Sequence, residues 1–136
     1  MIRKFARVKP PQLETVVDQS VATLAAIAGP HFDAEETRTA IKAGVERSFN
    51  PVGVARQAAA VAGSRDRTQH LGSIKAPTLV IHGLVDPLVK PSGGVATTRA
   101  IPGSRLLAFG DMGHDLPRPR WPEMCEAITD NCRRAG

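Results

Sequence analysis

The sequence predicts a mixed α/β fold, in which a parallel β-α-β-α unit follows a helical segment. In the first 64 residues, apolar side chains recur every three to four positions, which is typical of helices with one buried face. Two apolar runs at 77–82 and 104–109 are separated by enough residues for a helix, and a helical pattern follows the second. This alternation predicts two parallel strands. We therefore divide the chain into a helical segment, 1–64, and an α/β segment, 65–136.

The first predicted helix opens at Pro10-Pro11 and is stopped by Gly29-Pro30. Its apolar residues fall on one stripe with a period of 3.6 residues. This stripe comprises Leu13, Val16, Val17, Val21, Leu24 and either Ile27 or Ala28.

Two further helices are predicted before residue 64. Asp33 can cap the second helix, with Glu36 completing a capping box. Asn50-Pro51 suits the start of the third helix, because proline is favoured at the first helical position, and Gly63 ends it. The apolar face of the second helix is expected to comprise Ile41, Val45 and Phe49.

The α/β segment begins with the run PTLVIH at 77–82, whose continuous apolar character predicts a strand buried on both faces. A helix is expected at 91–100, a second strand at 104–109, and a loop through the sequence GDMGHDLPRP. The last helix is expected to bury one stripe, which comprises Trp121, Met124, Cys125, Ile128 and Cys132. The two cysteines, seven positions apart, are then reduced thiols packed as small apolar groups.

Two candidate catalytic residues follow the predicted strands. Asp86 lies four residues beyond His82, where the first strand ends, and His114 lies five residues beyond Phe109, where the second ends. Neighbouring parallel strands lie about 5 Å apart and end at the same edge of a sheet, where reacting groups gather. A carboxylate that accepts the imidazole N–H would fix the ring tautomer and leave the other nitrogen free as a base.

Asp86 and His114, each taken alone, also have simpler interpretations. An aspartate before a proline, as in Asp86-Pro87, is commonly a turn residue, and a loop histidine is commonly solvated.

We expect His82 to be bonded locally, and Asp111 and Asp115 to stabilise the loop around His114. Gly113 would let a substrate approach closely. The two remaining histidines, His31 and His70, are expected to be surface groups.

The segment 65–136 resembles the C-terminal part of α/β-hydrolases of the esterase and lipase-like branch. The similarity lies in IKAPTLVIHGLVDPLV and in AIPGSRLLAFGDMGHDLPRPRWPEMCEAI. The family phrase G-M-G-H-D-L-P stands here at 111–117, with Asp111 in place of the first glycine. The resemblance implies that Asp86 is the acid and His114 the base of a catalytic triad. It also implies that residues 1–64, which match more loosely, are a helical cap.

The serine nucleophile of such a triad is missing from the sequence. In that family it lies on a G-x-S-x-G turn that precedes the acid and the histidine. None of the six serines has glycine at both flanking positions, and neither cysteine does. We therefore expect the nucleophile and most strands of the sheet to be supplied from elsewhere. Three alternatives are open: a truncated gene product, a wrongly assigned start of the chain, or one fragment of a split enzyme.

Two functions of different classes remain open. The first is an ester hydrolase that uses Asp86 and His114, acts on a small-molecule ester once a nucleophile half is present, and requires no cofactor or metal. The second is a non-catalytic remnant or interaction module that pairs with another chain. Unpaired strand edges and an uncovered apolar face also favour self-association of the isolated chain.

Composition and charge argue against several other classes of protein. The formal net charge is +5, with basic clusters at residues 3–9 and at Arg133-Arg134, but aromatic residues make up only 4% of the chain. Without stacking aromatics or a groove-binding motif, we do not expect a nucleic-acid partner. No stretch is apolar enough for a membrane span, and the basic N-terminus lacks the apolar region of a secretory signal. These features predict a cytoplasmic protein.

Overall fold

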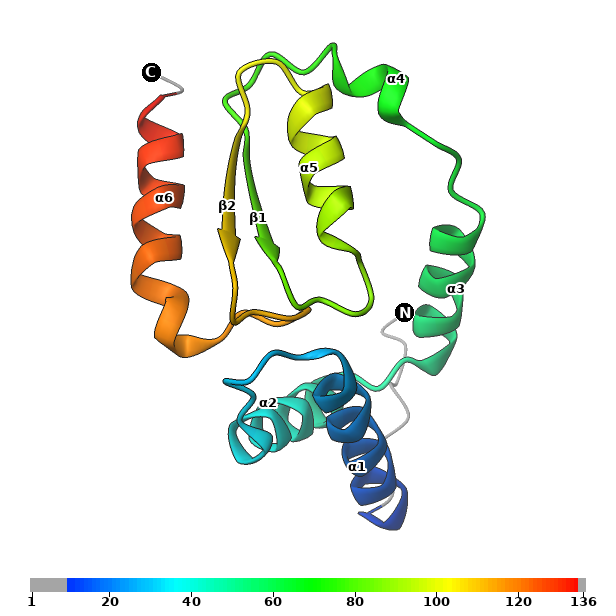
Figure 1. The fold of residues 1–136 in the computed structure, drawn as a ribbon. Coiled ribbons are helices and arrows are strands. Elements are labelled where there is room, and N and C mark those ends of the chain that lie inside the picture. Colours follow the sequence, from blue (N-terminus) through cyan, green and yellow to red (C-terminus); the bar gives the residue numbers. More distant parts are fainter. Residues whose placement is uncertain (1–9, 135–136) are drawn as a thin grey trace. The chain divides into compact units, whose positions relative to one another are not determined.

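A computed structural model describes residues 10–134 of the 136-residue chain, in which helices and a small parallel sheet occur together (Figure 1). By their contacts, these residues form two compact units. The N-terminal unit comprises residues 10–23 and 33–65, and the C-terminal unit comprises residues 24–32 and 66–134. The predicted basic cluster at residues 3–9 lies outside the described residues.

The N-terminal unit is helical, as predicted. Its helices are α1 (Pro10–Ile27), whose last turn belongs to the C-terminal unit, α2 (Ala34–Arg47) and α3 (Pro51–Ala62). The Asp33 carboxylate accepts the Glu36 N–H at the start of α2, and the Asn50 side chain accepts the Gly53 N–H at the start of α3. Side-chain caps of this kind satisfy amide groups that have no partner within the helix.

The apolar stripes of these helices are only partly buried. In α1, Val17 and Val21 are buried, whereas Leu24 at the far end of the stripe is exposed. Phe49 lies beyond the end of α2, so it does not extend the face that Ile41 and Val45 form. Ion pairs add to the contact between α1 and α2, including Asp18 with Arg38 at 2.6 Å and Glu14 with Lys42 at 3.0 Å.

The C-terminal unit contains the predicted β-α-β-α order. Its elements are α4 (Thr68–Leu71), β1 (Leu79–Gly83), α5 (Pro91–Ala100), β2 (Arg105–Phe109), the 3₁₀ helix η1 (Arg118–Arg120) and α6 (Trp121–Arg133). The two strands are parallel, with Leu79 opposite Arg105 and Gly83 opposite Phe109, and they lie between α5 and α6 (Figure 1). Both strands therefore end at the same edge. The sequence did not indicate α4 or η1, which are short turns of four and three residues.

The expectation that the first strand is buried on both faces is wrong. Leu79 to His82 are all half-buried, and only Gly83 is fully buried. The sheet among the described residues has two strands, so each strand keeps one edge without a hydrogen-bonded neighbour. Solvent reaches β1 from that edge, although α5 and α6 both contact the strand.

The predicted buried stripe of the last helix also needs correction. Only Met124 of that stripe is buried, whereas Trp121, Ile128 and both cysteines are exposed. The helix is rotated so that Met124, Ala127 and Asn131 face inward, and the Asn131 side chain donates to the Pro77 carbonyl at 3.0 Å. Met124 packs with Phe109 and Met112 in the core of the unit, with Ile81 and Leu107 against them.

Among residues 10–134, no helix combines the length and the apolar character that a membrane crossing requires.

Candidate active site

Asp86 lies in the loop after β1, and the loop wraps around its carboxylate. Oδ1 accepts the backbone N–H groups of Leu88 at 2.8 Å and Val89 at 2.9 Å. Asp86 is the one buried charged residue in the described part of the chain, with 7% of its surface exposed. The loop around Asp86-Pro87 is therefore a turn, as the simpler interpretation held, but the turn leaves the second carboxylate oxygen available.

His114 uses that second oxygen. Its Nδ1 lies 2.8 Å from Asp86 Oδ2, although the two residues are 28 positions apart in the sequence. The structure therefore brings together the two predicted site residues, at the edge of the sheet where the sequence placed them. Their side chains differ in exposure, with 4% for Asp86 and 44% for His114.

The ionisation of Asp86 determines which ring nitrogen of His114 carries the proton. Burial acts to raise the pKa of Asp86, but the hydrogen bonds from Val89, His114 and Leu88 outweigh it and lower the pKa below its ordinary value. The carboxylate is then ionised at neutral pH and can only accept hydrogen bonds. Nδ1 of His114 must therefore be the donor, and in the neutral ring Nε2 carries the lone pair that a base needs.

An open cleft of about 320 Å³ lies beside this pair. Four of its lining side chains are apolar: Ile81, Val89, Met112 and Leu116. The remaining lining residues are His82, Gly83, Asp86, Gly113, His114 and Asp115. Among the residues that the structure describes, this lining includes no serine, threonine, cysteine or lysine. The cleft thus contains a carboxylate paired with an imidazole but none of these four side-chain types among the described residues beside them.

Backbone segments pack closely around the cleft. A Cβ at Gly83 would collide with the carbonyl groups of Met112 and Gly113, so glycine lets the end of β1 meet the loop at 110–117, which we call the histidine loop. Gly113 itself is buried against the backbone of Ile27 to Gly29. The expectation that Gly113 makes room for a substrate is therefore wrong, because the chain's own backbone occupies that space.

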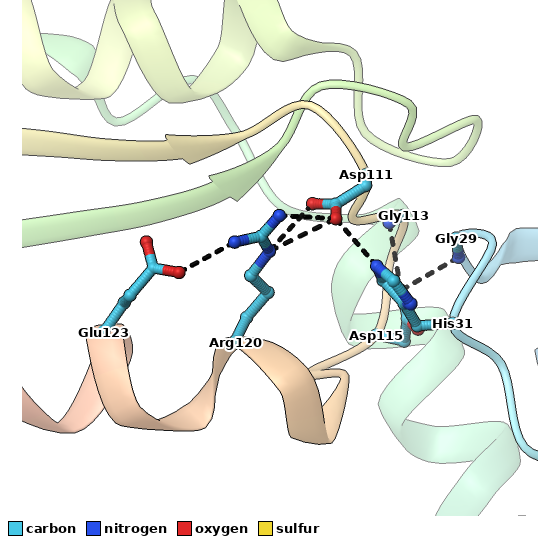
Figure 2. A network of polar contacts seen from close by, with 7 residues as sticks. All are labelled: Gly29, His31, Asp111, Gly113, Asp115, Arg120 and Glu123. Carbon is cyan, nitrogen blue, oxygen red and sulfur yellow. Dashed lines mark hydrogen bonds and ion pairs between the residues drawn. The ribbon is translucent and has the colours of Figure 1, made fainter.

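A polar network connects the histidine loop to residues before and after it (Figure 2). Asp111 accepts bonds from Arg120 Nη2 at 2.6 Å and Nε at 3.0 Å, and from His31 Nε2 at 2.7 Å. Arg120 also donates to Glu123 at 2.7 Å. The bonds from Arg120 and His31 hold the pKa of Asp111 well below its ordinary value. The carboxylates of Asp111 and Glu123 in turn raise the pKa of Arg120.

The other singled-out residues have structural partners. His82 donates from Nε2 to the Val89 carbonyl at 3.0 Å, which is the expected local bond. Asp115 accepts the N–H groups of Gly29 and Gly113, both at 3.0 Å, and so stabilises the loop as expected. His31 is exposed as predicted, but its contact with Asp111 was not foreseen. No sequence signal links residues 80 positions apart at this site.

Within residues 10–134, no three His, Cys, Asp or Glu side chains are grouped so that they could hold a metal ion. No model of a known protein family matches the sequence, and a search of curated proteins also found no match.

Proposed function

We propose that this chain carries the acid and the base of an ester hydrolase of the α/β-hydrolase type. The observation that carries the proposal is the 2.8 Å hydrogen bond between Asp86 and His114 at the common edge of two parallel strands. The order β1, α5, β2, α6 supports it, because the acid and the base follow successive strands. Asp86 orients the imidazole, and His114 acts as the base through Nε2.

The reaction requires a hydroxyl nucleophile, which in this proposal is a serine supplied from outside these 136 residues. His114 Nε2 takes the serine proton while the serine oxygen attacks the ester carbonyl carbon. The tetrahedral intermediate collapses, and the alcohol leaves with the proton from His114. Water then attacks the acyl-serine by the same proton transfers, which releases the carboxylic acid. No cofactor or metal takes part in these steps.

The cleft supports a small ester as the proposed substrate. Its apolar side chains Ile81, Val89, Met112 and Leu116 suit the hydrocarbon part of a small ester. The partly exposed imidazole can meet a serine that approaches from the open side of the cleft.

A non-catalytic interaction module is the second candidate function. Two observations favour it. The described lining of the cleft contains no serine, threonine, cysteine or lysine, and three large apolar residues of the loop at 84–90 are exposed, namely Leu84, Val85 and Leu88. Apolar side chains gathered on a loop in this way are typical of a surface that contacts another protein.

A fluorophosphonate probe, which forms a covalent bond with activated serines, distinguishes the two candidates. We expect the tagged chain, purified from its native cells, to bring with it a polypeptide that contains G-x-S-x-G and reacts with the probe. The separated chain should neither react nor hydrolyse p-nitrophenyl esters. His114→Ala should abolish labelling, whereas His70→Ala, at an exposed position in α4, should preserve it.

The other outcomes are equally informative. If the material purified with the wild-type chain contains no labelled polypeptide and hydrolyses no ester, the hydrolase proposal is wrong and the interaction module is favoured. Robust hydrolysis by the separated chain would instead show that the nucleophile lies within these 136 residues.

A further inference from the structure

We propose that Asp115 is a positioning residue, which fastens the loop that carries His114 to the backbone of residues 27–29 and thereby holds the imidazole against Asp86. The catalytic meaning of this role rests on the proposed function. The contact itself is a property of the C-terminal unit, to which both segments belong.

The two segments meet backbone to backbone. The His114 N–H donates to the Ile27 carbonyl at 2.7 Å, which fixes the main chain at the histidine itself. One residue earlier, a Cβ on Gly113 would lie 2.6 Å from Gly29 N and Ile27 O, and a Cβ on Gly29 would lie 2.7 Å from Gly113 N. Real side chains do not fit at such distances, so this approach requires glycine in both segments.

Asp115, the residue after His114, adds hydrogen bonds between the same two segments. Its Oδ1 accepts the N–H of Gly113 in its own loop and the N–H of Gly29 in the facing segment, both at 3.0 Å (Figure 2). One oxygen atom therefore joins two backbone segments that are more than 80 positions apart. Hydrogen bonds to an ionised carboxylate are stronger than those between neutral groups.

A second link leads from the same segment to the start of the loop. His31 donates to Asp111, which is held in turn by Arg120 at the end of η1 (Figure 2). The loop is thus bonded on both sides of His114, at positions 111 and 115, to residues 29 and 31. A rotation of the loop would break bonds at both places.

The imidazole depends on this support because its own surroundings are open. The His114 side chain is 44% exposed, so packing restrains it little, and the bond to Asp86 sets its orientation. That bond requires the His114 backbone to stay at a fixed distance from the buried carboxylate. The bonds that Asp115 accepts come from the backbone N–H groups of Gly29 and Gly113, so it acts on the imidazole through the loop, although it also lines the cleft. We therefore call it a positioning residue.

Solution NMR of protein with ¹⁵N-labelled histidine tests this role through the proton on His114 Nδ1. In Asp115→Ala, we expect this proton to exchange with water at least about tenfold faster than in the wild-type chain, as one charge-assisted hydrogen bond would predict. Asp115→Asn keeps an oxygen acceptor for both N–H groups, so it should restore most of the protection. A general structural role for the carboxylate would not produce this selective rescue at one ring nitrogen.

Asp66→Ala is the matched control, because Asp66 accepts the Thr68 N–H at 2.9 Å but does not line the cleft. It should leave the His114 signal unchanged. The inference is overturned if Asp115→Ala exchanges like the wild type, or if Asp115→Asn and Asp66→Ala exchange as fast as Asp115→Ala. Should Asp115→Ala fail to fold, the comparison of Asp115→Asn with the wild type decides, because unprotected Nδ1 in that variant also overturns the inference.

The same NMR experiment distinguishes a failure of this inference from a failure of the proposed function. If the wild-type chain shows no protected Nδ1 proton, the contact between Asp86 and His114 is absent and the proposed function fails. If the proton is protected in the wild type and in Asp115→Ala alike, only the role of Asp115 fails.

Discussion

If the proposed complex with a serine-containing polypeptide exists, His114→Ala is expected to lower its ester hydrolysis by about 10⁶-fold, the usual cost of removing one member of a catalytic triad. The reason is that Nε2 of His114 is the proposed acceptor of the serine proton and the proposed donor to the leaving alcohol. An alanine at this position can perform neither transfer. The rate of p-nitrophenyl ester hydrolysis, measured on the purified complex, checks this expectation.

Asp86→Asn should reduce the same rate by about 10⁴-fold, because an amide can stabilise the wrong tautomer of the imidazole. The fall should appear mainly in kcat, since Asp86 is buried and does not need to bind the ester. His70→Ala serves as the control and should retain the wild-type rate. More than a tenth of the wild-type rate in His114→Ala would contradict the assignment of the base.

The second large effect is expected at Gly113. The Cβ of Gly113→Ala would collide with the backbone of residues 27–29 and displace the N–H of His114 from the Ile27 carbonyl. Backbone atoms cannot rotate away as side chains do, so one of the two segments must shift. We expect the free energy of unfolding to fall by about 3 kcal/mol, the upper part of the usual range for overpacking.

The fluorescence of Trp121 during urea unfolding measures this loss, because the chain has one tryptophan and its Nε1 donates to the Leu116 carbonyl in the histidine loop. Gly110→Ala is the matched control, three positions earlier, where an added Cβ meets no atom within 4 Å. It should change the free energy of unfolding by less than about 0.5 kcal/mol. Equal midpoints for the two variants would show that residues 27–29 do not pack on Gly113 in solution.

The contact between Asp86 and His114 could be predicted because the placement of both residues follows from local rules. An apolar run identifies each strand, and parallel strands end at one edge, so residues that follow them meet there. The helix caps at Asp33 and Asn50 were predictable for the same reason, since a cap involves only residues three positions apart.

The predictions of which residues are buried were wrong where burial depends on the other segments that pack on a helix or strand. The run at 77–82 has the composition of a central strand, yet β1 has one hydrogen-bonded neighbour in the described part of the chain. Helical periodicity identified α6 but not the face it buries, because the face that turns inward is less apolar than the predicted stripe. Ala127 and Asn131 face inward, whereas Ile128 and Cys132 are exposed, and this orientation depends on contacts with the sheet and the residues before it.

The support of the histidine loop was not predictable from the sequence. Its contacts join residues 27–31 to residues 111–115, and no periodicity or motif connects positions that far apart. Gly113 illustrates the difficulty, because a missing side chain admits a substrate or a backbone segment equally well. Only the fold reveals which of them occupies the space.

The hydrogen bond between Asp86 and His114 is the central claim, and the tautomer of His114 tests it most directly. The ¹⁵N chemical shifts of the ring at neutral pH report which nitrogen carries the proton. We predict that Nδ1 is protonated and Nε2 is not in the wild-type chain, and that Asp86→Asn removes this preference. A wild-type ring protonated mainly at Nε2, with shifts that Asp86→Asn leaves unchanged, would contradict the account.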